Sequence, residues 1–241
     1  MPVLAERGYI IPAIGDQYVE CAHRLADSIQ QFHPDANIFI ITENLLPYGN
    51  QGGYANDWQM FAASPYRQTI KLEADMIAAG PIDHWWTLFE HRDVVISQGC
   101  RNFYNQSGTS RYYRKIFDAN GLPDVYNAVT YWRLSKTAQD FFMIVRSIFE
   151  HWAEYRTLLK FPDEEATTDV VYAMAAQIIG VENCTLPAGL GPQIVHMKKY
   201  INPIQGTDWT QELVWENNPL RINTVAQHGF VHYHVKEWIN E

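Results

Sequence analysis

Short apolar runs alternate with amphipathic stretches through the first part of the chain. The run Tyr9–Ile14 and the β-branched segment Asn37–Asn44 (NIFIITEN) have the length and composition of buried strands. Between them, apolar residues at helical spacing predict a helix over Gln17–Phe32, with Asp16 as its N-cap and Pro34 beyond its end. This strand–helix–strand order is typical of an open parallel sheet, which binds ligands beyond the carboxyl ends of its strands.

The same alternation continues along the rest of the chain. QTIKLEAD and DVVIS are predicted to be a third and a fourth strand, and VYNAVTYWRLS a strand pair or a strand followed by a turn. Helices are expected from Ile82, over Asp140–Lys160 and in the segment that ends at Gly180. Residues 181–241 lack long periodic runs. We therefore predict an α/β protein with one domain, an open and mostly parallel sheet flanked by helices, and a C-terminal lobe.

Composition narrows the class of protein. The chain has 241 residues and a formal net charge of −9, which argues against general binding of nucleic acids or anionic membranes. Its 3 cysteines are widely scattered, and the sequence has neither a signal-peptide pattern nor an apolar run of membrane-spanning length. A cytoplasmic protein is expected. The dinucleotide-binding GxGxxG, the P-loop, HExxH and the GxSxG elbow are also missing from the sequence.

Two carboxylates stand where the third strand ends. Glu73 and Asp75 are two residues apart in KLEADM, so both side chains can point to one side of the chain. Oxygen ligands of this kind suit Mg²⁺ or Mn²⁺, which proteins commonly share with substrate phosphates. The alternative is a pair of solvated carboxylates at the end of a strand.

The order of four segments resembles family 8-like glycosyltransferases of the GT-A fold. KLEADMIAAGPID resembles their "YLDADMLV…PID" region, and VYNAVTYWRLS is similar to their "FNAGVMLINL" strand. TTDVVYAM lies where they carry "DQDxLN", and VHMKKYINP looks like their "HFxGxxKPW" segment. The resemblance covers about residues 8–203. It implies a nucleotide-binding half over about 1–120 and an acceptor half with the C-terminal lobe over about 121–241.

The resemblance also implies a metal centre. Asp75 would be the main ligand of Mn²⁺ or Mg²⁺, Glu73 would contact the cation or the donor ribose, and His196 would be the distal ligand. Glu73 stands where the family has Asp, which leaves its role open. Lys198 or Lys199 would offset the charge of the leaving diphosphate.

Sugar and base contacts follow from the same resemblance. Asn127 would face the sugar, and Asp169 would lie beside the anomeric carbon, with Glu165 as a nearby alternative. Thr167 and Thr168 stand where the family has an acidic residue and an amide residue. This difference leaves open which sugar is transferred. The nucleotide base would meet three residues near the first turn, and a residue before the third strand, Asp57, is a further donor-site candidate. The three are Ile11, Ala13 and Tyr18.

One stretch reverses the sign of the chain's charge. From Val94 to Phe117 the sequence has neither Asp nor Glu but holds several basic and aromatic residues, and an ordinary surface loop is the alternative interpretation. Four of them are acceptor candidates: Arg101, Arg111, Tyr112 and Arg114. Phrases such as HMKKYIN and LRINT also resemble glycosyltransferase-like proteins of T4-type bacteriophages, in which hydroxymethylated cytosine in DNA receives a sugar. Near the end of the chain, His232 or His234 is an alternative to His196 as the distal metal ligand.

The sequence therefore predicts a metal-dependent glycosyltransferase, transferring a hexose or a pentose from a nucleotide-sugar, most simply a UDP-sugar, to a hydroxyl group. A modified base in phage DNA is the first candidate for the acceptor, and a glycan or a protein is the second. A non-catalytic nucleotide-sugar-binding protein of the same fold and a metal-dependent phosphohydrolase are the alternatives in other classes.

Overall fold

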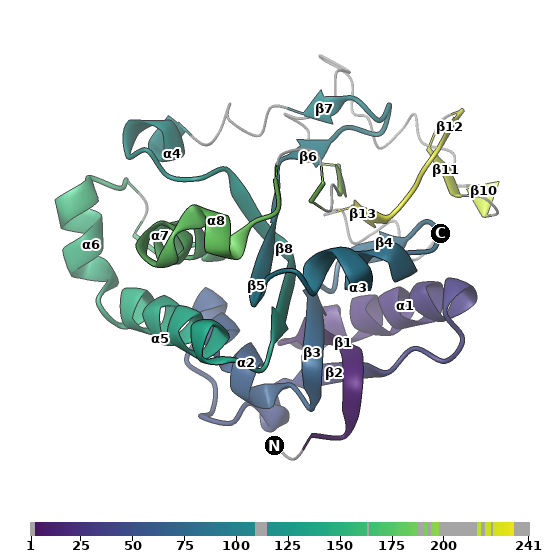
Figure 1. Ribbon diagram of the computed structural model, residues 1–241, viewed down its shortest axis with the longest axis horizontal. Helices are drawn as coiled ribbons and strands as arrows, with labels where there is room; N and C mark the ends of the chain where they lie inside the picture. Colours follow the sequence, from purple (N-terminus) through teal and green to yellow (C-terminus); the bar gives the residue numbers. More distant parts are fainter. Residues whose placement is uncertain are drawn as a thin grey trace.

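A five-stranded sheet forms the centre of the molecule (Figure 1). The computed structural model describes residues 3–108, 115–162, 164–187, 190–191, 194–197, 216–217, 220–222 and 224–233. The strand order is β2-β1-β3-β8-β5, and β8 runs antiparallel to both of its neighbours whereas the other four share one direction. In chain order the strands are β1 (Ala5–Ala13), β2 (Ile38–Thr42), β3 (Tyr66–Leu72), β5 (Val94–Gln98) and β8 (Val125–Arg133).

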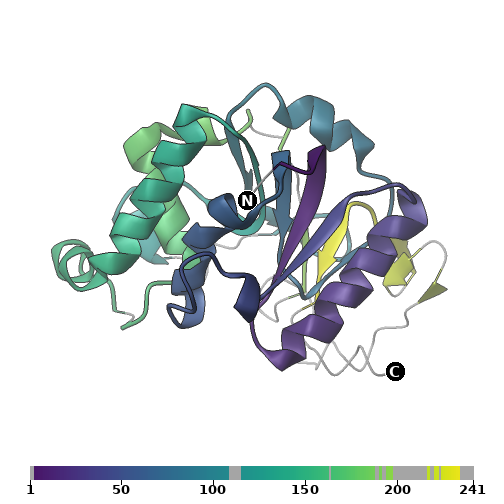
Figure 2. The ribbon, with the colours of Figure 1, turned by 90° about the horizontal axis from the view of Figure 1, so that it is seen from below.

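Helices cover both faces of this sheet because its strands are apolar on both sides. In β1, Tyr9 and Ile11 pack in one core with α1 (Asp16–Phe32) and α3 (Asp83–Phe89). Ile10, which points to the other face, belongs to a second core with α5 (Lys136–Glu150) and α7 (Thr168–Ile179). Figure 2 shows α1 on one side of the strands and α5 with α7 on the other.

A second sheet lies beside the carboxyl end of β3, above the central sheet in Figure 1. Its order is β4-β13-β9-β6-β7, so strands from the last part of the chain return to pair with β4, which follows β3 directly. Its members are β4 (Met76–Ala78), β6 (Cys100–Arg101), β7 (Ser107–Gly108), β9 (Val195–His196) and β13 (Phe230–His232). This return of the late strands brings the C-terminal part of the chain next to Glu73 and Asp75.

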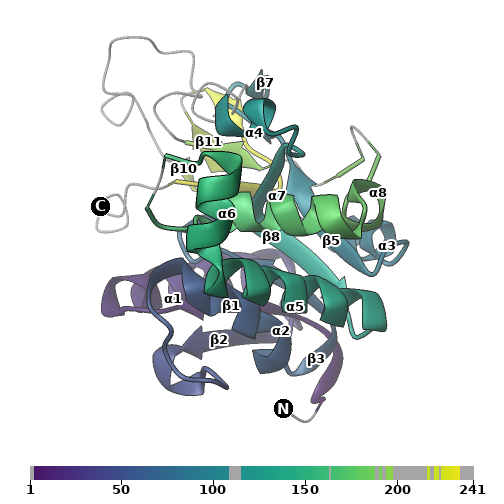
Figure 3. The same cartoon turned by 90° about the vertical axis from the view of Figure 1, so that its left-hand side faces the viewer.

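The other elements are short, and α6 continues the helical layer beyond α5 (Figure 3). A small antiparallel sheet has the order β10-β11-β12. The short elements, including the strands of this small sheet, are η1 (Glu43–Leu45), η2 (Gly53–Gln59), α2 (Met60–Ala63), α4 (Lys115–Ala119), α6 (Trp152–Leu159), α8 (Val181–Cys184), β10 (Glu216–Asn217), β11 (Leu220–Ile222) and β12 (Val225–Ala226). None of the helices in the described part of the chain is both long and apolar enough to cross a bilayer.

The predicted α/β class is confirmed, and two local predictions need correction. Asp16 is the first residue of α1 rather than its cap; Gly15 takes the cap position with a φ of 100°, which favours glycine. Of the two interpretations of VYNAVTYWRLS, a strand followed by a turn is confirmed: β8 has nine residues, the chain bends directly after it, and Ser135 caps α5. The long helix predicted over residues 140–160 is two helices, because the chain changes direction at His151.

Gly8 is required by a close approach of neighbouring strands. A Cβ atom there would lie 2.5 Å from Tyr66 Cζ and 2.8 Å from the backbone oxygen of Asn37. We expect Gly8→Ala to lower the free energy of unfolding by about 3 kcal/mol, because β1 or its neighbours must shift. Urea unfolding followed by circular dichroism measures the change.

Gly80 offers a matched control for that substitution. A Cβ atom at Gly80 would meet none of the described atoms within 4 Å. Gly80→Ala should therefore change the free energy of unfolding by less than about 1 kcal/mol. Equal losses in the two variants would contradict the steric explanation.

Candidate metal and donor site

Glu73, Asp75 and His232 meet at the junction of the two sheets. The two carboxylates lie in the turn between β3 and β4, and His232 is on β13, paired with Met76 of β4. His232 Nε2 lies 2.9 Å from Asp75 Oδ1 and 3.3 Å from Glu73 Oε2. The antiparallel pairing of β4 with β13 therefore brings together residues that are more than 150 positions apart in the sequence.

The ring of His232 is fixed from its other side. Its Nδ1 lies 2.8 Å from the hydroxyl of Tyr126, and the side chain is buried. Nε2 is thereby directed toward the carboxylates. A partner that fixes the second ring nitrogen is the usual arrangement for a metal-binding histidine.

Burial makes a charged Glu73 costly in the absence of a cation. It raises the pKa of Glu73 to about 7, and the charge of Asp75 adds to this effect, whereas His232 and Lys71 oppose it. Glu73 and Asp75 nevertheless keep 29% and 15% of their side chains exposed. The group is thus open to a ligand from solvent and gains stability when positive charge is added.

The donor atoms suit a small divalent cation. Two carboxylates and one imidazole form the ligand set that Mn²⁺ accepts, and ligand atoms of these three residues all lie within 4.8 Å of one another. Neighbouring ligands around an octahedral cation with bonds of about 2.1 Å are about 3 Å apart. Both separations from His232 Nε2 are close to that value.

Asp169 reaches the same region from the first turn of α7. Its Oδ1 accepts a hydrogen bond of 2.8 Å from the backbone N–H of Asn127 on β8. The register between β5 and β8 shifts between Ile96 and Ser97, an irregularity opposite this part of β8. On the next residue of β8, the carbonyl of Ala128 accepts from the N–H of Glu73, at 3.1 Å. Adjacent residues of one strand therefore hold Asp169 and Glu73.

The side chain of Asn127, predicted to face the sugar, lies inside the fold. It is fully buried; its Nδ2 donates to Asp57 Oδ2 at 3.3 Å, and its Oδ1 accepts from the Thr130 hydroxyl at 3.0 Å. The arrangement directs the amide toward these two residues and leaves its backbone N–H to hold Asp169.

His196 lies beside the carboxylate group rather than within it. It pairs with His232 across β9 and β13, and the two ring centroids are 5.5 Å apart. Among the described residues, His196 is not part of the set whose ligand atoms converge. His232, one of the two alternative histidines predicted from the sequence, belongs to that set.

The remaining predicted residues divide by their exposure. Ile11 and Ala13 are buried in the core beneath α1, whereas Tyr18, which packs at the edge of that core, is only partly buried. Glu165 is exposed just before α7. Arg101 is half-buried on β6, where its backbone N–H donates to the Ile194 carbonyl at 2.9 Å. The other candidates lie outside the described residues: Arg111, Tyr112, Arg114, Lys198, Lys199 and His234.

Sequence reasoning missed Tyr54. This residue is on η2, and its side chain is 53% exposed. Burial of part of the ring raises the pKa of Tyr54, and the charges of Glu73, Glu165 and Asp169 add to the shift. Tyr54 is thus within electrostatic range of these three carboxylates. The glycines before it gave only a turn signal, so the sequence offered nothing to connect this aromatic residue with Glu73.

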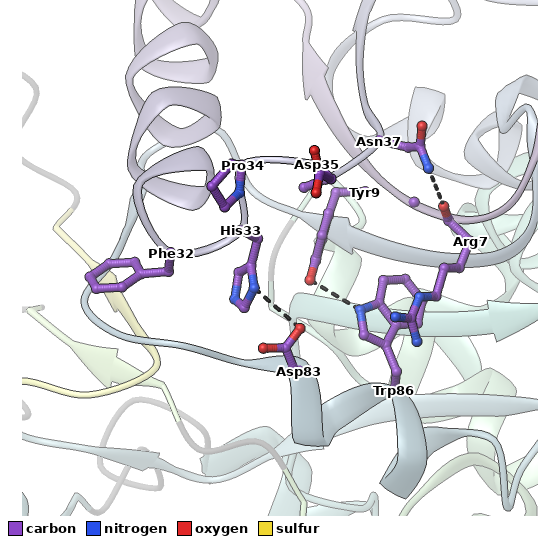
Figure 4. A pocket seen from close by; sticks show the side chains of 11 residues that line it. Arg7, Tyr9, Phe32, His33, Pro34, Asp35, Asn37, Asp83 and Trp86 are labelled. Atoms are coloured by element: carbon purple, nitrogen blue, oxygen red, sulfur yellow. Dashed lines mark hydrogen bonds and ion pairs between the residues drawn. The ribbon is translucent and has the colours of Figure 1, made fainter.

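A cavity of about 300 Å³ lies elsewhere, between the start of β1 and the ends of α1 and α3 (Figure 4). In it His33 Nδ1 is 3.2 Å from Asp83 Oδ1, and Trp86 Nε1 donates to the Tyr9 hydroxyl at 3.2 Å. None of Glu73, Asp75, Asp169 and His232 lines it. The cavity is therefore separate from the candidate site.

Substitution of His232 and substitution of His196 are expected to weaken metal binding by different amounts. His232→Gln should weaken Mn²⁺ binding on the order of 100-fold, because it removes a ligand, whereas His196→Gln should weaken it less than about tenfold. Electron paramagnetic resonance of free Mn²⁺ measures both dissociation constants. A larger loss with His196→Gln would instead favour the histidine assigned from the family resemblance.

Comparison with known proteins gives the architecture. Neither a protein-family model nor a curated protein matches the sequence. The galactosyltransferase LgtC, solved with donor and acceptor sugar analogues, matches with a TM-score of 0.51 and 14% identity over 97% of this chain and 94% of its own. Mouse xyloside xylosyltransferase 1 matches with a TM-score of 0.52 and 9% identity, over 96% and 98% of the two chains. GlyE from Streptococcus pneumoniae TIGR4 matches with a TM-score of 0.53 and 10% identity, over 97% and 60%. The chain therefore has the α/β fold of GT-A glycosyltransferases.

Proposed function

We propose that this protein is a divalent-metal-dependent glycosyltransferase that uses a nucleotide-sugar as its donor. The observation that carries the proposal is the convergence of Glu73, Asp75 and His232 beyond the carboxyl end of β3, in a chain with the GT-A fold. That edge is where an open α/β sheet binds its ligands.

Each residue of the site has a proposed role. Glu73, Asp75 and His232 would hold Mn²⁺ or Mg²⁺, which, when bound, neutralises charge on the donor diphosphate and on the leaving nucleotide. Asp169, fixed by the N–H of Asn127, would position the sugar. Tyr54, an exposed aromatic residue within electrostatic range of the carboxylates, would stack on the apolar face of the sugar.

For the acceptor, we propose a hydroxymethylated cytosine in DNA, from the basic aromatic stretch of the sequence. Arg101 is the first basic residue of this stretch and lies on the second sheet, on a strand that pairs with the β9 strand of His196. A phosphate beside Arg101 would offset the burial that lowers the pKa of its guanidinium. A glycan or protein hydroxyl is the second candidate.

A panel of nucleotide-sugars tests the proposal. Each donor is incubated with protein and Mn²⁺, with or without DNA that contains hydroxymethylcytosine, and the products are read by mass spectrometry. One donor should be consumed with Mn²⁺ and not with EDTA, and the DNA should gain the mass of one hexose or pentose per modified base.

The other outcomes separate the alternatives. Donor cleavage by Mn²⁺-loaded protein without transfer to DNA would move the acceptor proposal to a glycan or a protein. Calorimetric binding of UDP with neither cleavage nor transfer would indicate a nucleotide-sugar-binding protein instead. Release of phosphate from simple phosphate esters would indicate a phosphohydrolase.

A further inference from the structure

We propose that Asp57 is a positioning residue of the site: by joining β3, β8 and α7 and by pairing with Lys71, it sets the placement of Glu73 and Asp169. The proposal rests on the function proposed above and extends it to residues that do not touch the substrate. Asp57 lies on η2, and its side chain is 11% exposed.

Asp57 binds three buried side chains with two oxygen atoms. Its Oδ1 lies 2.5 Å from Lys71 Nζ, and its Oδ2 accepts hydrogen bonds from the Tyr172 hydroxyl and from Asn127 Nδ2. Lys71, Tyr172 and Asn127 are almost completely buried, and each belongs to a different element. A carboxylate shared in this way fixes the relative position of β3, α7 and β8.

Each of these three contacts leads directly to a residue of the site. Lys71 precedes Glu73 by two positions on the same chain segment. Tyr172 is three residues after Asp169, so the two lie on one face of α7, one turn apart. Asn127 donates its backbone N–H to Asp169. Replacement of Asp57 would therefore change the placement of both Glu73 and Asp169.

The charge of Asp57 is as important as its hydrogen bonds. Lys71 is fully buried between Ile70 and Leu72 on β3, and its charge acts on Glu73. Asp57 neutralises the ammonium group at close range. Without that partner, the ammonium would attract Glu73 and repel a divalent cation at the neighbouring site.

Two variants separate this electrostatic role from simple structural support. Asp57→Asn preserves the shape of the side chain but leaves Lys71 charged, and should weaken Mn²⁺ binding about tenfold or more. Asp57→Asn combined with Lys71→Met removes both charges and should restore Mn²⁺ affinity to within about threefold of the unmodified protein. Electron paramagnetic resonance of free Mn²⁺ gives the dissociation constants, and thermal melts show that each variant is folded.

If Asp57 served only the stability of the fold, the double variant would bind Mn²⁺ no better than the single one. That result, or unchanged Mn²⁺ binding in a folded Asp57→Asn variant, would overturn the electrostatic role. Failure of the unmodified protein to bind Mn²⁺ would instead overturn the proposed metal-dependent function itself, so the two failures are distinguishable.

A hydroxyl deletion tests the placement of Asp169 without any change of charge. Tyr172→Phe removes one hydrogen bond to Asp57 and should lower kcat for the donor identified in the panel about tenfold, with KM and Mn²⁺ affinity within about twofold. Tyr131→Phe is the matched control: Tyr131 is a buried tyrosine on β8 whose hydroxyl donates to Gln68 at 3.2 Å, away from the site. A similar kcat in both folded variants would overturn the role of Asp57 in placing Asp169.

Discussion

Replacement of Asp75 by Asn is expected to abolish sugar transfer. Asp75 supplies a carboxylate at the centre of the group, 2.9 Å from His232 Nε2. An amide has no negative charge and is a poor ligand for Mn²⁺ or Mg²⁺, so the stabilisation of the leaving nucleotide would be lost. Several kcal/mol of transition-state stabilisation correspond to at least about a thousandfold in kcat. The measurement is the Mn²⁺-dependent rate of donor consumption, together with Mn²⁺ binding.

Asp83→Asn is the matched control. Asp83 is the first residue of α3, its side chain is 72% exposed, and it lies in the separate cavity beside His33. The same change of charge there should leave kcat within about twofold, since this charge is far from the reacting group. Retained transfer in a folded Asp75→Asn variant would contradict the assignment of Asp75 as a metal ligand.

Trp132→Ala is expected to produce the largest loss of stability. Trp132 is fully buried on β8 and packs edge-on against Phe142 of α5, with ring centroids 4.9 Å apart, and against Phe61 of α2, at 6.4 Å. Truncation would remove these ring contacts between β8 and both helices and leave a cavity. The free energy of unfolding should fall by about 3–5 kcal/mol, measured by urea denaturation.

Leu134→Ala serves as the control for that loss. Leu134 follows β8 immediately and is 43% exposed, so its truncation creates no enclosed cavity. We expect a change of less than about 1 kcal/mol. Comparable losses in the two variants would mean that the core does not centre on β8.

The strands and the carboxylate pair could be predicted because their signals are local. β2, β5 and the second part of β1 are short apolar runs, and the spacing of Glu73 and Asp75 after β3 is visible in six consecutive residues. Local signals also explain the errors. The apolar pattern continues through His151 although the chain bends there, and a glycine with positive φ took the cap position that Asp16 was expected to fill.

The rest of the site depends on pairings between distant parts of the chain. His232 approaches Asp75 only because β13 pairs with β4, and the sequence left it as one of three candidate histidines. Asp57 reaches Lys71 and Tyr172 from positions 14 and 115 residues away, which no local pattern encodes. The family resemblance predicted that Asn127 faces the sugar, whereas its amide is buried and donates to Asp57, a contact 70 residues away that no local pattern encodes.

The central claim is that Glu73, Asp75 and His232 together hold a divalent cation. The most direct test is an anomalous difference map from crystals of the protein grown with Mn²⁺ and recorded at the manganese edge. We expect a single strong peak about 2.0–2.3 Å from His232 Nε2 and from an oxygen of each carboxylate. A map without a peak at that position, or with a manganese peak that does not contact Asp75, would contradict it.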